Sequence, residues 1–169
     1  MEVDYIIRQL DLNKRAFEQL LKVKSSKEAT WKPGPDKWCL LEIICHLVDE
    51  EVEDFRVRVK TALYPDQYDL IPIDPEGWVE SRQYMAQDYE EKVAEWLGER
   101  EKSLHWLQSL SHPNWQSHLE HPEMGPITAM RFLANWLAHD HIHIRQILKV
   151  RQAYLEHITG QNLSYAGNW

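Results

Sequence analysis

The sequence predicts an all-α fold, specifically an antiparallel four-helix bundle with long loops. Apolar residues recur at three- and four-residue steps through four long segments, which is the spacing of amphipathic helices. Segments rich in proline separate these four, and alternating β-branched runs bounded by Asn-Gly or Asp-Gly turns are absent. Long amphipathic helices bury their apolar faces against one another. A length of 169 residues fits one domain, so we expect a single domain over residues 1–169.

Two of the expected helices lie in the N-terminal half. The first covers about residues 3–23 and ends at a segment that contains two prolines and a glycine, which cannot continue a helix. The second begins near Cys39, runs to about Leu63 and is stopped by Pro65.

The other two expected helices lie in the C-terminal half. The third begins at about Ser81 or Gln87 and ends at about Leu110, after an acidic, proline-bearing connector. The segment SHPNWQSHLEHPEMGP carries three prolines and is expected to be a loop. The fourth helix begins after Pro126, since proline is favoured at a helix start, and continues past Val150.

Composition and charge exclude several classes of partner. The 19 Lys and Arg against 27 Asp and Glu give a net charge of −8, which disfavours binding to nucleic-acid backbones. Charge interrupts every apolar stretch before the roughly 20 residues that a bilayer requires, so no membrane partner is expected. The charged N-terminal segment does not resemble a secretory signal, and two cysteines make no disulfide framework. We therefore expect a cytoplasmic protein.

The run HDHIH in the fourth expected helix is the most specific signal among the nine histidines. His139 and His143 are four residues apart, so they lie on one helix face and can present two imidazoles to one ion. His141 is two residues from each and lies about 160° away from either around the helix. The alternative is that the pair is a solvated or capped surface feature.

The second expected helix supplies a third histidine. His46 lies in the apolar stretch IICHLVDEE and faces inward, either as a ligand or as a core histidine held by one hydrogen bond. Helix bundles build metal sites from side chains on facing helices. Three neutral imidazoles with an open position form a typical catalytic zinc site.

Two motifs of the chain resemble those of a known family. WKPGPDKWCLLEIICHLVDEE and WLAHDHIHIRQI resemble the DinB/YfiT-like superfamily of metalloenzymes, and the resemblance covers nearly the whole chain. Its specific parts are the Trp-x6-Trp, His-Leu-x-x-Glu and His-x3-His-x2-Gln-Ile runs. The resemblance implies a four-helix bundle, often dimeric, that holds a divalent ion, usually Zn or Ni. Carried over by position, the metal ligands are His46, His139 and His143.

Two further residues are candidates for catalysis. Glu50 lies one turn beyond His46, where it can orient a ligand imidazole, as can Asp140; alternatively, Glu50 belongs to a solvated face. Arg100 falls on the apolar stripe of the third expected helix, and a buried charge is rarely unpaired. It holds either a substrate carboxylate near the metal or an acid inside the bundle, such as Glu50.

The leading functional hypothesis is a divalent-metal-dependent enzyme with a small-molecule substrate. The bound ion would lower the pKa of a water or thiol and polarise an electrophile. The family resemblance implies an S-transferase that uses a low-molecular-weight thiol as cosubstrate, and a homodimer. The alternatives are a metal-dependent hydrolase, a non-catalytic metal-binding protein of a stress response, and a family member that binds nothing. A second metal site at His118 and His121 is a weaker alternative, because their loop carries no cysteine.

Overall fold

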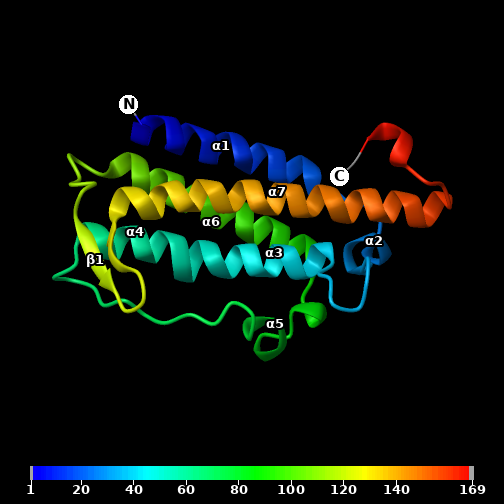
Figure 1. Ribbon diagram of the computed structural model, residues 1–169, viewed down its shortest axis with the longest axis horizontal. Coiled ribbons are helices and arrows are strands. Elements are labelled where there is room, and N and C mark those ends of the chain that lie inside the picture. Colours follow the sequence, from blue (N-terminus) through cyan, green and yellow to red (C-terminus); the bar gives the residue numbers. More distant parts are fainter. Residues whose placement is uncertain (1, 168–169) are drawn as a thin grey trace.

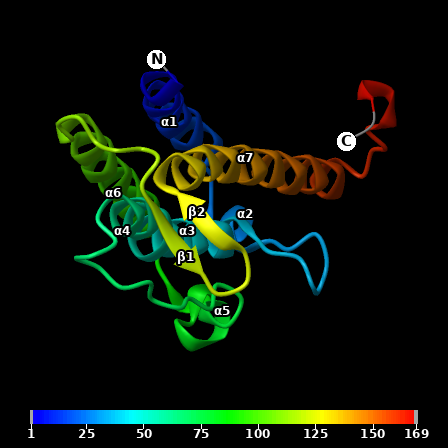
Figure 2. The same cartoon turned by 60° about the vertical axis from the view of Figure 1, so that its left-hand side comes forward.

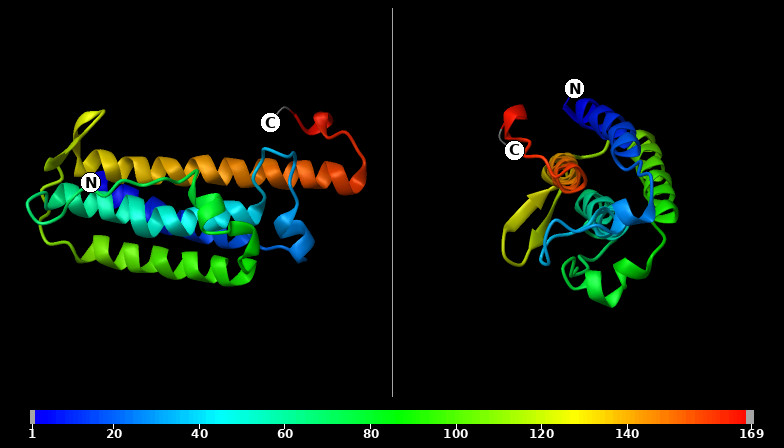
Figure 3. Two further views of the ribbon diagram at one scale, coloured as in Figure 1. Left: turned by 90° about the horizontal axis from the view of Figure 1, so that it is seen from below. Right: turned by 90° about the vertical axis from the view of Figure 1, so that its right-hand side faces the viewer.

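The computed structural model describes residues 2–167 as a helical bundle, and the predominantly helical fold expected from the sequence is confirmed. Four long helical segments lie side by side (Figure 1). Around the bundle, the first segment contacts the third and fourth, and the second contacts the same two from the other side (Figure 3). In chain order the segments are α1 (Glu2–Leu20), the continuous run of α3 (Leu40–Asp49), η1 (Glu50–Phe55) and α4 (Arg56–Leu63), then α6 (Tyr89–Ser109) and α7 (Ala129–Thr159).

The second segment changes its hydrogen-bonding pattern in the middle. Its first part, α3, begins after Cys39, whose backbone N–H donates to the Glu42 carboxylate. The middle part, η1, is a π-helical turn that α4 continues without a break. In a π-helical turn the backbone hydrogen bonds span five residues, one more than in an α-helix, and such turns occur frequently at functional sites. Four residues of η1 are buried: the acids Glu50, Glu51 and Asp54, and the apolar Phe55.

The third long helix begins later than either expected start. Its first residue is Tyr89, and the Asp88 side chain caps it by accepting the backbone N–H of Glu91. Gln83 has a φ of 50°, in the left-handed region, so the chain before Asp88 cannot be one continuous helix. The chain forms short helical elements here and in two other places: α2 (Ser26–Thr30), α5 (Trp78–Ser81), η2 (Tyr84–Ala86) and η3 (Ser164–Ala166).

The loop expected before the fourth helix contains a β-hairpin. The strands β1 (His118–His121) and β2 (Gly125–Thr128) pair antiparallel, and the hairpin packs against α4 and the start of α7 (Figure 2). Leu119 pairs with Ile127 across the strands, and both side chains are buried. This buried pair attaches the hairpin to the bundle. The three prolines of the segment had predicted a loop, and they gave no sign of the hairpin.

Apolar side chains from all four segments fill the bundle in two groups, one toward each end. In the first, the rings of Phe17 and Trp96 meet edge to face with centroids 4.7 Å apart. The second includes Leu104, Leu133 and Trp136. Over residues 2–167, none of the helices has both the length and the apolar composition that crossing a bilayer would need.

A charged network lies inside this apolar core. Arg100 of α6 is 1% exposed, and its guanidinium pairs with Glu51 of η1 and Asp140 of α7. The Arg100 nitrogens lie 2.9 Å from both Glu51 oxygens and 2.7 and 2.8 Å from the two Asp140 oxygens. Trp136 donates to Glu51, and Asn13 of α1 donates to Asp140. The network therefore joins all four long segments.

The Arg100 guanidinium has no donor left over. It carries five N–H groups, and four of them donate to the two carboxylates. The fifth faces the backbone carbonyl oxygen of Leu10, 3.5 Å from Nη1. A buried ion network is stable only when every member is satisfied, and this one meets that condition at its centre.

Replacing Arg100 tests how much the fold depends on this network. In Arg100→Met, two buried carboxylates lose their cation, and the free energy of unfolding is expected to fall by about 3–5 kcal/mol. Urea denaturation followed by far-UV circular dichroism measures the change. Arg15→Met is the matched control, because Arg15 forms an exposed pair with Asp11, and its loss should cost less than about 1 kcal/mol. Equal losses in the two variants would contradict the structural role of Arg100.

Candidate metal centre

Three histidine side chains from two helices converge inside the bundle. His46 comes from α3, and His139 and His143 lie one turn apart on α7. The His139 Nε2 lies 3.4 Å from the His46 Nε2 and 3.0 Å from the His143 Nε2. The ligand atoms of all three lie within 4.8 Å of one another, and no other group of three or more metal-binding side chains occurs in residues 2–167.

This geometry fits a divalent cation. Two nitrogens that bind one zinc ion at 2.0–2.1 Å with a tetrahedral angle are about 3.3 Å apart, close to the observed Nε2 separations. The His143 Nδ1 lies 2.7 Å from the Gln146 side-chain oxygen, which accepts its proton and leaves the lone pair on Nε2. A cation between the rings would satisfy lone pairs that otherwise face one another.

Burial keeps the three imidazoles neutral. Desolvation, with a smaller contribution from His143, lowers the pKa of His46 to about 3. Desolvation and the two neighbouring histidines lower the pKa of His139 to about 2. The pKa of His143 is also lowered by burial, against the opposing effect of Gln146. Neutral imidazole is the form that binds metals, so all three are ready to do so at neutral pH.

Aromatic rings enclose the histidines on two sides. The Trp38 ring lies 5.0 Å from the His46 ring, and the Phe55 ring lies 4.8 Å from the His139 ring, between centroids. Trp31, at the other end of the Pro-Gly-Pro loop, packs instead against Tyr154 of α7. Of the two loop tryptophans, Trp38 alone has its ring against a histidine of the group in the described part of the chain.

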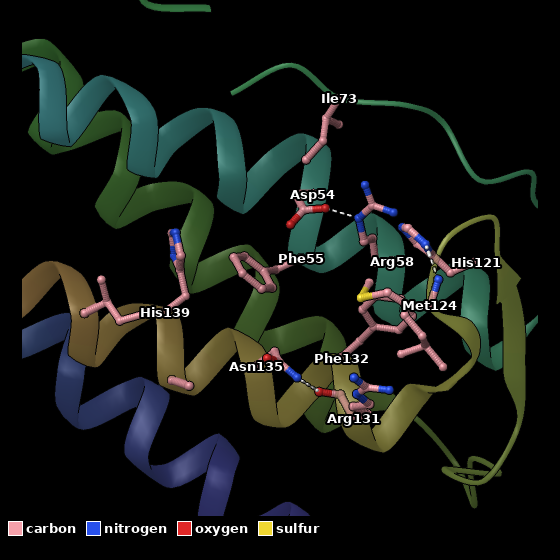
Figure 4. Close-up of a pocket in the computed structure, with 13 residues that line it drawn as sticks. Asp54, Phe55, Arg58, Ile73, His121, Met124, Arg131, Phe132, Asn135 and His139 are labelled. Carbon is pink, nitrogen blue, oxygen red and sulfur yellow. Dashed lines mark hydrogen bonds and ion pairs between the residues drawn. The ribbon is translucent and has the colours of Figure 1, made fainter. Parts of the chain in front are cut away.

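A cavity of about 360 Å³ opens beside His139. Figure 4 shows His139 at one end of the lining residues, with Phe55 next to it and the hairpin residues His121 and Met124 at the far end. Most of the wall is apolar, with a few polar side chains among the lining residues. Cavities of this size, mostly apolar with a few polar groups, bind small molecules. Of the three histidines, His139 lines this cavity, so a small molecule in it would lie next to the group.

Comparison with known proteins agrees with this geometry. The family model of the DinB superfamily matches residues 9–147. The chain belongs to the DinB superfamily. The resemblance seen in its motifs is thereby confirmed, although no curated protein matches the sequence.

A solved DinB-like structure shares the fold. YfiT from Bacillus subtilis, described as a probable metal-dependent hydrolase with an unusual four-helix bundle topology, superposes with a TM-score of 0.77. The alignment covers 95% of this chain and 89% of YfiT at 19% sequence identity. At that identity the likeness establishes the fold and leaves the activity to be argued from the site.

Glu50 of this DinB superfamily member is not among the residues that line the cavity, and it makes no hydrogen bond to His46. It is 5% exposed, and its buried Oε1 has no hydrogen-bond partner in residues 2–167. The neighbouring Asp54 pairs with Arg58 and lines the cavity. Burial and the neighbouring Asp54 raise the pKa of Glu50 to about 8. The buried Nδ1 of His46 has no partner in residues 2–167, so neither Glu50 nor Asp140 orients that ring.

Arg100 occupies the interior position that its apolar stripe suggested. Of the two alternatives drawn from the sequence, the structure contains the ion pair inside the bundle, and the acids are Glu51 and Asp140, with Glu50 not among them. With every N–H engaged and 1% exposure, Arg100 has no donor for a substrate carboxylate. Its connection to the histidines is indirect, through Asp140, which directly follows His139.

Several residues of the site were missed or left without a role by sequence reasoning. Gln146 appeared in the His-x3-His-x2-Gln motif, and its three-residue offset from His143 was the available signal. Asp54 and Phe55 lie in the π-helical turn and line the cavity; helical periodicity placed Phe55 on the inward face, but no sequence pattern predicted the turn or a role for Asp54. His141 is exposed, in keeping with its opposite helix face.

The raised pKa of Glu50 predicts a pH dependence of stability. Between about pH 4.5 and about pH 8 the folded protein keeps a proton that the unfolded chain has released, so stability falls as the pH rises through this window. The slope from this group is at most about 1.4 kcal/mol per pH unit. Glu50→Gln removes it, and the stability of this variant relative to wild type is expected to rise with pH.

Urea denaturation at intervals from pH 4.5 to pH 8 measures this difference. Glu90→Gln, at an exposed position of α6, is the control and should follow the wild-type profile. Parallel profiles for wild type and Glu50→Gln would show that Glu50 is ionised in the folded protein at neutral pH.

Proposed function

We propose that this DinB superfamily member is a divalent-metal-dependent hydrolase of a small molecule, folded as one antiparallel four-helix-bundle domain with long loops. The observation that carries the proposal is the convergence of three neutral imidazoles beside a cavity. The description of YfiT as a probable metal-dependent hydrolase adds support for the reaction class.

In this proposal His46, His139 and His143 hold the ion, with Zn or Ni as the expected metals. A bound divalent ion supplies Lewis-acid polarisation of the substrate and lowers the pKa of a coordinated water. Gln146 holds the His143 ring in one orientation through Nδ1. The Arg100 network fixes the distance between η1 and α7, and thereby helps to keep the histidines of α3 and α7 together.

Other side chains prepare the cavity for a substrate. Phe55 and Phe132 line it with apolar surface beside His139. Asp54 lies at the wall, where Arg58 pairs with its carboxylate. The raised pKa of Glu50, caused by burial and by Asp54, keeps a proton on Glu50 at neutral pH, and Glu50 and Asp54 are the candidate acid–base carboxyl groups of the proposal.

Thiol-dependent S-transfer, a homodimer and a cytoplasmic location remain expectations drawn from the sequence and its family resemblance. A non-catalytic metal-binding protein would have the same three histidines. The cavity beside His139 favours an enzyme over this alternative, because it gives a small molecule access to the histidine group.

The metal site is tested by elemental analysis of protein purified without chelator or affinity tag. Wild type should retain about one equivalent of a divalent metal, the content of a single site. His46→Ala, His139→Ala and His143→Ala should each lose it, with helical circular dichroism near that of wild type. His141→Ala is the matched control, because it removes an exposed histidine of the same helix. Unchanged metal content in any of the first three variants would remove that residue from the ligand set.

The reaction is tested with p-nitrophenyl esters, and with an aryl halide plus cysteine for S-transfer. The proposal expects ester hydrolysis that stops on chelation, returns with added metal, is lost in His139→Ala and persists in His141→Ala. If the protein turns over only the aryl halide with cysteine, the proposed hydrolase is wrong and the protein is a thiol-dependent S-transferase. Metal retention without turnover of either substrate class would favour the non-catalytic alternative.

A further inference from the structure

The cavity beside His139 has an uneven distribution of polar groups. Its body is apolar, and a few basic side chains line it (Figure 4). The apolar lining consists of Phe55, Ile73, Met124, Ile127, Phe132, Ala138 and Ile142. His121, from β1, lies at the hairpin end, and Arg131, an exposed residue in the first turn of α7, lies on another side of the lining.

Arg131 is the cation of this cavity that lacks a partner. The other arginine, Arg58, pairs with Asp54, so those two charges cancel. In the described part of the chain the Arg131 guanidinium has no hydrogen-bond or ion-pair partner, and only its backbone is engaged, by Thr128 and Asn135. The wall of the cavity therefore carries one uncompensated positive charge.

We propose that the cavity binds a small monocarboxylate with an apolar body, whose carboxylate is held by Arg131. A guanidinium fork matches the two oxygens of a carboxylate. The apolar body lies along Phe55 and Phe132. The placement of the reacting group beside His139 rests on the proposed function, whereas recognition of the carboxylate does not require the metal.

One free cation suits one negative charge. A phosphate or dicarboxylate would bring a second negative charge, which the Arg58–Asp54 pair does not neutralise because Asp54 already uses its cation. The chain as a whole carries a net charge of −8, which further disfavours multiply charged anions. The cavity is therefore selective for a monoanion.

Ligand-observed NMR titration with 3-phenylpropionate and its uncharged amide, 3-phenylpropanamide, tests the proposal. The acid should bind wild type about tenfold or more tightly than the amide, as expected for a hydrogen-bonded charge. Arg131→Gln should weaken the acid by about the same factor and leave the amide unchanged. Arg145→Gln makes the same charge change at an exposed position of α7 outside the cavity lining, and should bind both ligands as wild type does.

Equal affinities for acid and amide, no detectable binding of the acid, or an Arg131→Gln variant that binds the acid normally would each overturn the proposal. Circular dichroism of each variant checks the fold. Titrations with chelator-treated and with zinc-loaded protein separate this inference from the proposed function. Failure to take up zinc, with Arg131-dependent binding intact, would overturn the metalloenzyme and leave the carboxylate site standing. Zinc uptake without Arg131 dependence would do the reverse.

Discussion

The buried charge of Arg100 is the constraint on which much of this structure depends. A guanidinium in an apolar core costs several kcal/mol unless opposite charges and hydrogen bonds surround it. Its two carboxylate partners lie on η1 and α7, the elements that follow His46 and carry His139. The pairing thus sets the approach of the second and fourth segments at the level where the imidazoles meet. Asn13 extends the same network to α1.

The sequence predicted those parts of the fold and site that follow from regular helical periodicity. Four amphipathic segments, the one-turn spacing of His139 and His143, and an inward His46 all follow from 3.6 residues per turn. The partners of Arg100 did not follow from it. Glu51, and not Glu50, faces the guanidinium, because the π-helical turn changes the angular spacing of this acidic run.

Tertiary packing also decided features that local patterns could not reveal. The hairpin forms in a segment with three prolines because Leu119 and Ile127 are buried against the bundle. The sequence pattern assigned no role to Arg131, an exposed residue of α7. Only the fold places it in the same cavity as His139 and Phe55, which come from different parts of the chain. Proximity between distant segments is the information that a single sequence lacks.

The hairpin and the histidine group share one cavity but belong to separable parts of the molecule. The three metal-site histidines lie within the bundle and are held by its core. His121 and Met124 lie in the β-hairpin, which contacts α4 and the start of α7. A change in the hairpin alters the far wall of the cavity without disturbing the buried network. Exchange of this one small segment can therefore reshape the far wall of the cavity while the histidine group of the bundle keeps its geometry.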